Sequence, residues 1–220
     1  MATQRYRLVI GNKNWSSWSL RPWLAMKRLG LPFEEINIRL RRPESKEQLL
    51  AYCPSGLVPT LLDGDLAIWH SLAILDYLAE QHPNIEMWPR NQAARAIARS
   101  VSAEMHSGFQ ALRENFPMEL LAQHSKNSLS PAVEMDIRRI VDIWRDCRAR
   151  FGSGGPFLFG QFSAADAMYA PVASRFRTYA GDLAGYGDDG TARAFVEAVF
   201  AMPEMADWTD GARAEMAAAD

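Results

Sequence analysis

The sequence has few of the features that mark secreted, membrane-spanning or metal-binding proteins. It contains two cysteines in 220 residues, Cys53 and Cys147, which form no CxxC pair and no zinc-ligand spacing. No apolar run approaches the roughly 20 residues needed to span a bilayer, and the N-terminus lacks the long apolar segment of a secretory signal. We therefore expect a protein of a reducing, cytoplasmic setting, with no membrane partner and no bound metal.

An excess of positive charge is also absent. Lys and Arg total 24 against 26 Asp and Glu, a net charge of −2. Without a basic excess to neutralise phosphates, we expect no nucleic-acid partner. Hydrophobic residues make up 48% and charged residues 23%, which suits a packed core and disfavours a disordered chain.

The first third of the chain alternates strand-like and helix-like segments. Residues 6–10 alternate polar and apolar side chains before Gly-Asn, which is typical of a strand followed by a loop. Residues 16–29 place apolar side chains at roughly helical spacing, and Gly30 stands where a helix commonly closes. Residues 33–38 have the pattern of a second strand. This order predicts a parallel pair of strands joined by a right-handed crossover.

A hairpin and a helix are expected next, after a loose polar stretch at residues 39–48. Two apolar runs, residues 58–62 and 66–69, flank Asp-Gly-Asp, which is a good hairpin sequence. Ser71 then stands where it can cap the helix that follows. The predicted order of the first domain, residues 1–83, is therefore β-α-β followed by β-β-α.

The remainder of the chain predicts helices only. Residues 84–91 hold few periodic side chains and lie among prolines, so we place a linker there and an all-helical domain at residues 92–220. Residues 92–123 form one long candidate helix, and Ser130, followed by proline, is expected to open another that runs to about Phe151.

A capping box is predicted near the middle of this second domain. Residues 163–166, Ser-Ala-Ala-Asp, have Asp in the place usually given to Glu, before a helical run at residues 168–176. Two shorter helices are expected to complete the chain. The predicted fold class is thus α/β plus all-α.

The segment richest in chemical groups lies between the first strand and the first helix. Residues 14–21 read Asn-Trp-Ser-Ser-Trp-Ser-Leu-Arg, so three hydroxyls gather where a helix N-terminus presents unpaired N–H groups and a partial positive charge. Such a place stabilises an anion, and a hydroxyl there can hydrogen-bond a thiolate. Lowering a thiol pKa by ~2 units needs roughly 2.7 kcal/mol. The alternative is that these serines are only helix caps.

A second segment carries a proline at the entrance to a strand. Residues 53–60 read Cys-Pro-Ser-Gly-Leu-Val-Pro-Thr, and Pro59 would remove a donor from the sheet ladder. A cis Val58–Pro59 peptide would turn the chain sharply and leave the backbone groups of Val58 free to pair with an extended peptide. An ordinary edge-strand proline is the alternative.

A third segment, residues 69–74, has the sequence Trp-His-Ser-Leu-Ala-Ile. Ser71 and the first N–H groups of the helix face one open end, which makes a second anion site suited to a carboxylate. A plain N-cap is the alternative.

Taken together, these segments resemble the glutathione transferase superfamily, which has a thioredoxin-like N-terminal domain and an all-helical C-terminal domain. Residues 16–21 look like the Ser-Ser-Cys-Ser-Trp-Arg motif of its zeta class, which includes maleylacetoacetate isomerases. Residues 53–59 resemble Asn-Pro-x-Gly-x-Val-Pro, which carries the cis-proline, and residues 70–74 resemble Glu-Ser-x-Ala-Ile. Residues 162–166 look like the superfamily's capping box and hydrophobic staple. The resemblance covers nearly the whole chain.

The resemblance implies a role for each matching residue. Ser16 would activate glutathione, the co-substrate, with Ser17 able to share or take that role. Val58 would hold the cysteinyl backbone of glutathione, and Ser71 would bind its γ-glutamyl carboxylate. Asp166, with its capping partner, would be structural. A homodimer is also implied.

Three residues depart from the family pattern. Cys53 replaces the usual Asn before the proline, which we interpret as a packing change. Leu57 stands where many members place a Lys or Gln that meets glutathione near its glycyl end. His70 stands where a Glu is usual, and an imidazole accepts less well from the tripeptide's ammonium group. Losing one such partner would cost on the order of 1–3 kcal/mol, or ~10–100-fold in affinity.

The second substrate is expected between the two domains, as a small hydrophobic electrophile. One side would be formed by the long helix and the other by two tryptophans: Met105, His106, Phe109, Leu112 and Arg113 opposite Trp15 and Trp18. Each of these residues could equally belong to the core. Arg95 and Arg99 share a helical face and either pair across a dimer or are solvated.

Three functional hypotheses follow. The first is a glutathione-dependent transferase, or a zeta-like cis-trans isomerase, in which a serine hydroxyl stabilises the thiolate. The second is a non-catalytic binding or scaffold protein with a degraded glutathione site, supported by Leu57 and His70. The third, a thiol–disulfide oxidoreductase, is disfavoured because it needs a cysteine at the start of the first helix, and residues 16–19 have none.

Overall fold

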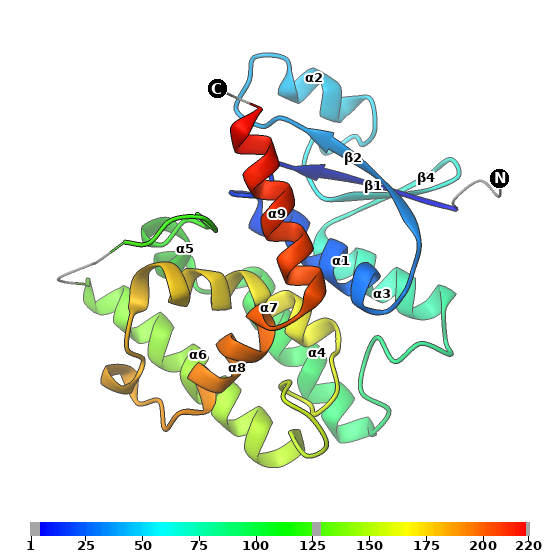
Figure 1. The fold of residues 1–220 in the computed structure, drawn as a ribbon. Helices are drawn as coiled ribbons and strands as arrows, with labels where there is room; N and C mark the ends of the chain where they lie inside the picture. The colour runs from blue at the N-terminus through cyan, green and yellow to red at the C-terminus, as the bar shows by residue number, and fades with distance from the viewer. Residues whose placement is uncertain (1–4, 125–128, 219–220) are drawn as a thin grey trace.

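A computed structural model describes residues 5–124 and 129–218 (Figure 1). Its first part is a four-stranded sheet, formed by β1 (Tyr6–Gly11), β2 (Phe33–Ile38), β3 (Thr60–Asp63) and β4 (Leu66–Trp69) in the spatial order β2-β1-β3-β4. β1 and β2 are parallel, whereas β3 is antiparallel to both β1 and β4. The predicted β-α-β unit and hairpin are therefore confirmed.

Three helices belong to this first part: α1 (Ser17–Arg28), α2 (Ser45–Leu50) and α3 (Ser71–Gln81). The short helix α2 was not predicted, because six residues with few apolar side chains give almost no periodicity. Ser71 is also not the cap that the sequence predicted. His70 occupies the N-cap position with a φ of +68°, and Ser71 is the first helical residue.

The register of the sheet brings three loops together at one end of the strands. Val9 pairs with Thr60, and Thr60 pairs with Trp69. The loop after β1, the chain entering β3 and the residue after β4 therefore lie side by side. These are the three segments in which the sequence predicted chemistry.

The second part of the molecule is helical, as predicted. It contains α4 (Gln92–Ser107), α5 (Gln110–Asn115), α6 (Pro131–Phe151), α7 (Ala164–Arg175), the π-helix η1 (Phe176–Ala180), the 3-10 helix η2 (Ala184–Tyr186), α8 (Thr191–Phe200) and α9 (Pro203–Ala217). The chain between α3 and α4 forms neither helix nor strand.

One long helix predicted for residues 92–123 is instead two helices, and this prediction was wrong. α4 ends at Ser107, and Phe109 adopts a left-handed φ of +59° before α5 begins. The Arg113 guanidinium donates to the carbonyls of Met105, His106 and Gly108, which the end of α4 leaves unpaired. Apolar spacing does not reveal such a break, because its stabilising contact comes from a charged side chain.

Helix α7 is buried along its whole length and packs against α1, which joins the two parts. The predicted capping box at its start is confirmed. The Ser163 backbone N–H and hydroxyl donate to Asp166 Oδ2 at 2.8 and 2.9 Å, and the Leu158 N–H donates to Asp166 Oδ1 at 2.8 Å. Burial raises the pKa of Asp166 to about 6.

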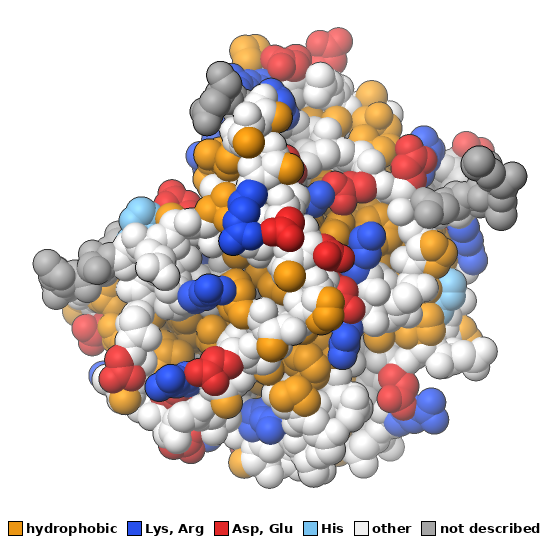
Figure 2. All heavy atoms as spheres, in the orientation of Figure 1, with side chains coloured by type: hydrophobic (Ala, Val, Ile, Leu, Met, Phe, Trp, Pro, Cys, Tyr) orange, Lys and Arg blue, Asp and Glu red, His pale blue; other side chains and the backbone are white. Residues whose placement is uncertain are grey.

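The surface seen in Figure 2 mixes acidic and basic side chains and carries no continuous field of one sign. Within the described part of the chain, no helix is long and apolar enough to cross a membrane.

Candidate active site

The two adjacent serines at the start of α1 differ in what their hydroxyls do. Ser16 is the N-cap residue, but its side chain makes no capping hydrogen bond. Its hydroxyl instead donates to Ser19 Oγ at 2.7 Å, which also accepts the Gly11 N–H at 3.0 Å. Ser17 Oγ accepts a hydrogen bond from Arg175 Nη2 at 3.2 Å. Among the described residues the Ser17 hydroxyl hydrogen has no acceptor.

Arg175, the last residue of α7, brings a buried positive charge behind Ser17. Its Nε donates to the Phe116 carbonyl at 2.8 Å, and its Nη1 has no partner within the described ranges. Burial, and then the charge of Arg113, lower the pKa of Arg175 to about 10, so it stays protonated at neutral pH. A hydroxyl beside such a charge favours an anion. Arg175 was not among the residues predicted from the sequence, although an arginine in a largely apolar helical run is a sign that sequence alone offers.

Trp18 replaces the cysteine of the zeta-class motif and lies among cationic side chains. The Arg21 guanidinium lies 4.0 Å from its ring centroid and that of Arg113 lies 4.6 Å away. Arg21 is fully buried, and its two terminal nitrogens have no partner among the described residues. Burial, together with the charges of Arg113 and Arg175, lowers the pKa of Arg21 well below its usual range. Arg21 and Arg113 thus lie on Trp18 and Arg175 on the neighbouring Ser17, and among the described residues none of the three forms an ion pair with a carboxylate within 4 Å.

Two histidines continue this cluster toward α3. The ring of His106, on α4, meets Trp18 at 5.2 Å and His70 at 5.7 Å between centroids. Burial lowers the pKa of His106, and the neighbouring Arg21, His70 and Arg113 lower it further. Its Nδ1 is buried without a partner among the residues described. His106 is therefore neutral at physiological pH.

Ser71 is fully buried at the start of α3. Its hydroxyl donates to Met168 Sδ at 3.8 Å, a weak acceptor, and the Met168 carbonyl accepts from Arg21 Nε at 3.1 Å. Met168 of α7 therefore links the starts of α1 and α3. The first and third predicted segments do come together.

The second predicted segment contains the cis peptide Val58–Pro59, as predicted. No backbone hydrogen bond of Val58 occurs within residues 5–124 and 129–218. Leu57 is 54% exposed and offers no polar group at its side chain. Lys46 Nζ, however, donates to the Ser55 carbonyl at 3.1 Å, so α2 supplies a cation beside this loop.

The residues predicted to bind the electrophile fall into two groups by burial. Met105, Phe109 and Leu112 belong to the hydrophobic core, as the alternative had it. His106, Arg113 and Trp18 are half-buried, with the Trp18 ring against both the His106 ring and the Arg113 guanidinium, and Trp15 is 41% exposed. The half-buried group is more cationic and less apolar than the predicted set as a whole.

The predicted dimer arginines have partners within their own chain. Arg95 donates to the carbonyls of Pro89 and Arg90, and Arg99 pairs with Asp76 at 3.8 Å. Neither side chain needs a second copy to satisfy it.

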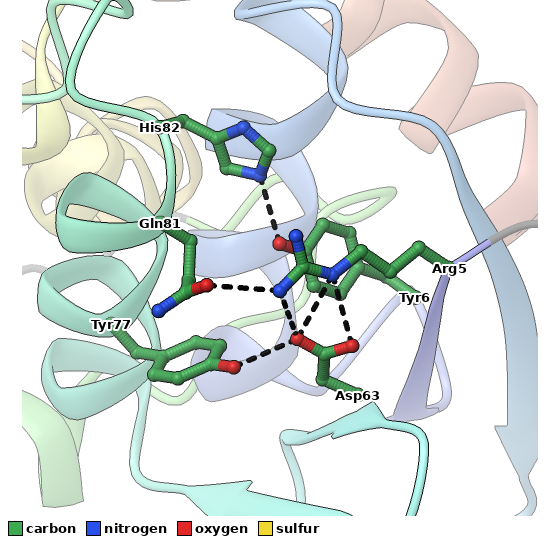
Figure 3. Close-up of polar contacts among 6 residues, drawn as sticks. All are labelled: Arg5, Tyr6, Asp63, Tyr77, Gln81 and His82. Atoms are coloured by element: carbon green, nitrogen blue, oxygen red, sulfur yellow. Dashed lines mark hydrogen bonds and ion pairs between the residues drawn. The ribbon is translucent and has the colours of Figure 1, made fainter.

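A second polar cluster, drawn in Figure 3, lies at the opposite end of the sheet. Arg5 forks onto Asp63, which also accepts the Tyr77 hydroxyl at 2.7 Å, and Arg5 reaches Gln81 at 2.9 Å. These contacts join the beginning of β1 and the end of β3 to α3. The cluster is half-exposed and paired, so it is a structural tie.

Other features do not add to the candidate site. Within the described residues no group of three or more His, Cys, Asp and Glu side chains could hold a metal ion. A cavity of about 740 Å³ between η1 and α8 is lined by neither Ser16 nor Ser17.

Comparison with known proteins places these features in a family. Residues 15–81 match the model of the glutathione S-transferase N-terminal domain, and residues 119–214 match that of its C-terminal domain. A probable maleylacetoacetate isomerase of Caenorhabditis elegans is 34% identical over 121 residues, 55% of this chain and 56% of that protein. The match thus spans little more than half of that relative's length.

Solved structures agree on the fold. A glutathione transferase homologue from Burkholderia, with bound glutathione, has a TM-score of 0.69 at 23% identity, covering 94% of this chain and 97% of that one. A zeta-class maleylpyruvate isomerase has a TM-score of 0.69 at 22% identity, covering 92% and 95%. Two models of one family match successive parts of the chain and the fold agrees with both, so the chain belongs to the glutathione S-transferase family, with a zeta-like sequence.

Proposed function

We propose that the protein is a glutathione-dependent transferase or isomerase in which Ser17, rather than Ser16, stabilises the glutathione thiolate. The observation that carries this proposal is the hydrogen bond from Arg175 to Ser17 Oγ, which leaves the serine hydrogen free for a ligand. The hydroxyl of Ser16 is already donated to Ser19. Glutathione bound here supplies a thiolate that adds to an electrophilic carbon, giving a conjugate, or an adduct that rotates and releases it again, giving cis–trans isomerisation.

The residues present fit glutathione. The unpaired backbone groups of Val58 suit an extended tripeptide, and the start of α3 at Ser71 suits its γ-glutamyl carboxylate. Because Ser71 is fully buried, we assign this contact to the backbone N–H groups as much as to its hydroxyl. Leu57 has no polar group to meet glutathione near its glycyl end. We assign part of that contact to the ammonium group of Lys46, which lies beside the same loop.

We further propose that the electrophile carries a carboxylate rather than being merely hydrophobic. Arg21 and Arg175 hold buried guanidinium nitrogens that have no partner among the described residues, and Arg113 lies beside them. An anionic ligand would satisfy such groups. Unsaturated keto acids of the maleylacetoacetate and maleylpyruvate kind, named in the related proteins, meet this requirement.

Replacing each of the two serines by alanine in turn tests the mechanism. Ser17→Ala should lower kcat about 100-fold, the ordinary cost of removing one donor to a reacting anion, while calorimetry shows glutathione affinity nearly unchanged. Ser16→Ala is the matched control and should lose much less. The reverse ranking would make Ser16 the donor.

The competing hypothesis is a scaffold that has lost the tripeptide site, favoured by the exposed Leu57 and by His70. Calorimetric titration with glutathione separates the two. A millimolar or tighter constant supports the enzyme, and no heat at high glutathione concentration supports the scaffold.

A homodimer remains a proposal from the family resemblance. The edge strand β4 exposes Leu66 by 51% and Trp69 by 38%, which is apolar surface that a second copy would cover. Sedimentation of the wild type and of Leu66→Glu tests it.

A further inference from the structure

We propose that the C-terminal helix α9 holds the serine-bearing loop in its working position, with Glu215 as a positioning residue. This inference rests on the proposed function, because it assigns Glu215 a role in presenting Ser16 and Ser17. The contact is remote in sequence, since about 200 residues separate Glu215 from the loop. Figure 1 shows α9 running from the helical part up to the sheet.

The loop is held at three successive residues. Asn12 Oδ1 accepts the Leu40 N–H at 2.8 Å, from the chain after β2. Asn14 accepts the Leu120 N–H through its carbonyl at 3.2 Å and the Leu121 N–H through Oδ1 at 3.0 Å. Lys13, between them, is held by α9.

Helix α9 takes both backbone groups of Lys13. The Lys13 N–H donates to Glu215 Oε2 at 2.9 Å, and its carbonyl accepts from Trp208 Nε1 at 2.9 Å. Glu215 Oε1 in turn accepts from Asn37 Nδ2 on β2. A charged acceptor on a backbone N–H is among the stronger hydrogen bonds.

The side chain of Lys13 adds a second set of contacts. Its ammonium group pairs with Glu35 and lies 5.6 Å from the Trp208 ring centroid. Trp208 is fully buried and meets Trp23 of α1 edge-to-face at 5.0 Å. The indole N–H of Trp23 donates to Glu35 Oε2 at 2.7 Å. α9 is therefore fastened to the loop and to α1 at once.

The position of the loop determines where the serines point. The Asn12 carbonyl accepts the N–H groups of Trp15 at 3.1 Å and Ser16 at 2.8 Å, and the Ser17 N–H donates to the Trp15 carbonyl at 3.0 Å. A shift at residues 12–14 is therefore transmitted to both hydroxyls. Misplacing a reacting group by about 1 Å can cost as much as 10²-fold in rate.

A second glutamate of α9, Glu204, serves as the control for Glu215. Glu204, in the first turn of α9, pairs with Arg28 of α1 at 3.4 Å. This contact also ties α9 to the first part of the molecule, but it does not touch the loop. A purely structural role for α9 predicts that losing either glutamate has the same consequence.

The test compares Glu215→Ala with Glu204→Ala in the full chain. Hydrogen exchange at residues 12–19 should quicken in Glu215→Ala only. Its kcat should fall about tenfold or more, and the pH profile of kcat/KM should move to higher pH, because a displaced hydroxyl stabilises the thiolate less. Thermal midpoints of the two variants should be similar.

The outcomes separate this inference from the proposed function. Unchanged exchange at residues 12–19 in Glu215→Ala, or equal changes in both variants, would overturn the positioning role whatever the activity. Local loosening with an unshifted pH profile would overturn it too. A wild type without glutathione turnover would remove the proposed function, and the serine-positioning role with it, while the exchange data still report whether α9 holds the loop.

Discussion

The molecule has two polar clusters at opposite ends of one sheet, and they are built in opposite ways. The cluster around Arg5 and Asp63 is half-exposed, and each charge faces an opposite charge or a hydrogen-bond partner (Figure 3). The cluster around Trp18 gathers Arg21, Arg113 and Arg175, and nitrogens of Arg21 and Arg175 have no hydrogen-bond partner in the described part of the chain. Both rely on arginine and an aromatic ring.

The difference shows which of the two is suited to a ligand. An exposed ion pair adds little stability and has nothing left to bind. A buried, unpaired charge destabilises the fold. Such charges are commonly found at functional sites, where they contribute to binding or catalysis. The first cluster therefore ties α3 to the sheet, whereas the unpartnered charge of the second is our reason for proposing an anionic ligand there.

Replacing Arg175 should give the largest effect on activity of the variants compared here. In Arg175→Met the Ser17 hydroxyl loses its cationic donor, so we expect kcat/KM to fall about 100-fold. Stability should fall by no more than about 1–3 kcal/mol, because the lost hydrogen bond to the Phe116 carbonyl is partly offset by removal of a buried charge. Steady-state kinetics and thermal unfolding measure the two effects. A large loss of stability at full activity would mean that Arg175 is structural.

Asp63→Asn tests the other end of the sheet, where only stability should change. The hydrogen bond from Arg5 lowers the pKa of Asp63; burial opposes this shift, and the hydrogen bond from Tyr77 adds to it. A lowered carboxyl pKa contributes stability above the unfolded value of about 4, and this is lost as the pH falls through the folded value. Unfolding by denaturant should therefore separate wild type from Asp63→Asn at neutral pH and bring them together in acid. Turnover should remain within about twofold, because the cluster lies far from the serines.

How much of this contrast the sequence could predict depends on the kind of contact. The strands, the hairpin and the capping box at Ser163 follow from local spacing and composition, and each was predicted. The cis Val58–Pro59 peptide was predicted from residue type within one short segment, whereas the role of the paired serines stays a prediction. Such features can be predicted from local sequence because they depend on neighbours in the chain.

Contacts between distant segments were not predictable in this way. Arg175 reaches Ser17 across 158 positions, and Glu215 reaches Lys13 across 202. The break in the helix at Phe109 depends on Arg113 turning back onto carbonyls. A side chain's type shows what it can donate, but only the fold determines which acceptor it meets.

The smallest expected effect is on the pH dependence of stability, through His106. The ring of His106 lies between the arginines around Trp18 and the ring of His70. Burial lowers the pKa of His106, with Arg21, His70 and Arg113 adding to the shift. A base with a lowered folded pKa binds fewer protons when folded, so stability declines as the pH falls below the unfolded value of about 6.5. In His106→Phe this decline should be shallower, which denaturant unfolding between neutral and mildly acidic pH can measure. His124→Phe is the matched control, because His124 pairs with Glu119 at the surface. If the two variants flatten the acid decline equally, the cations around Trp18 do not govern the titration of His106.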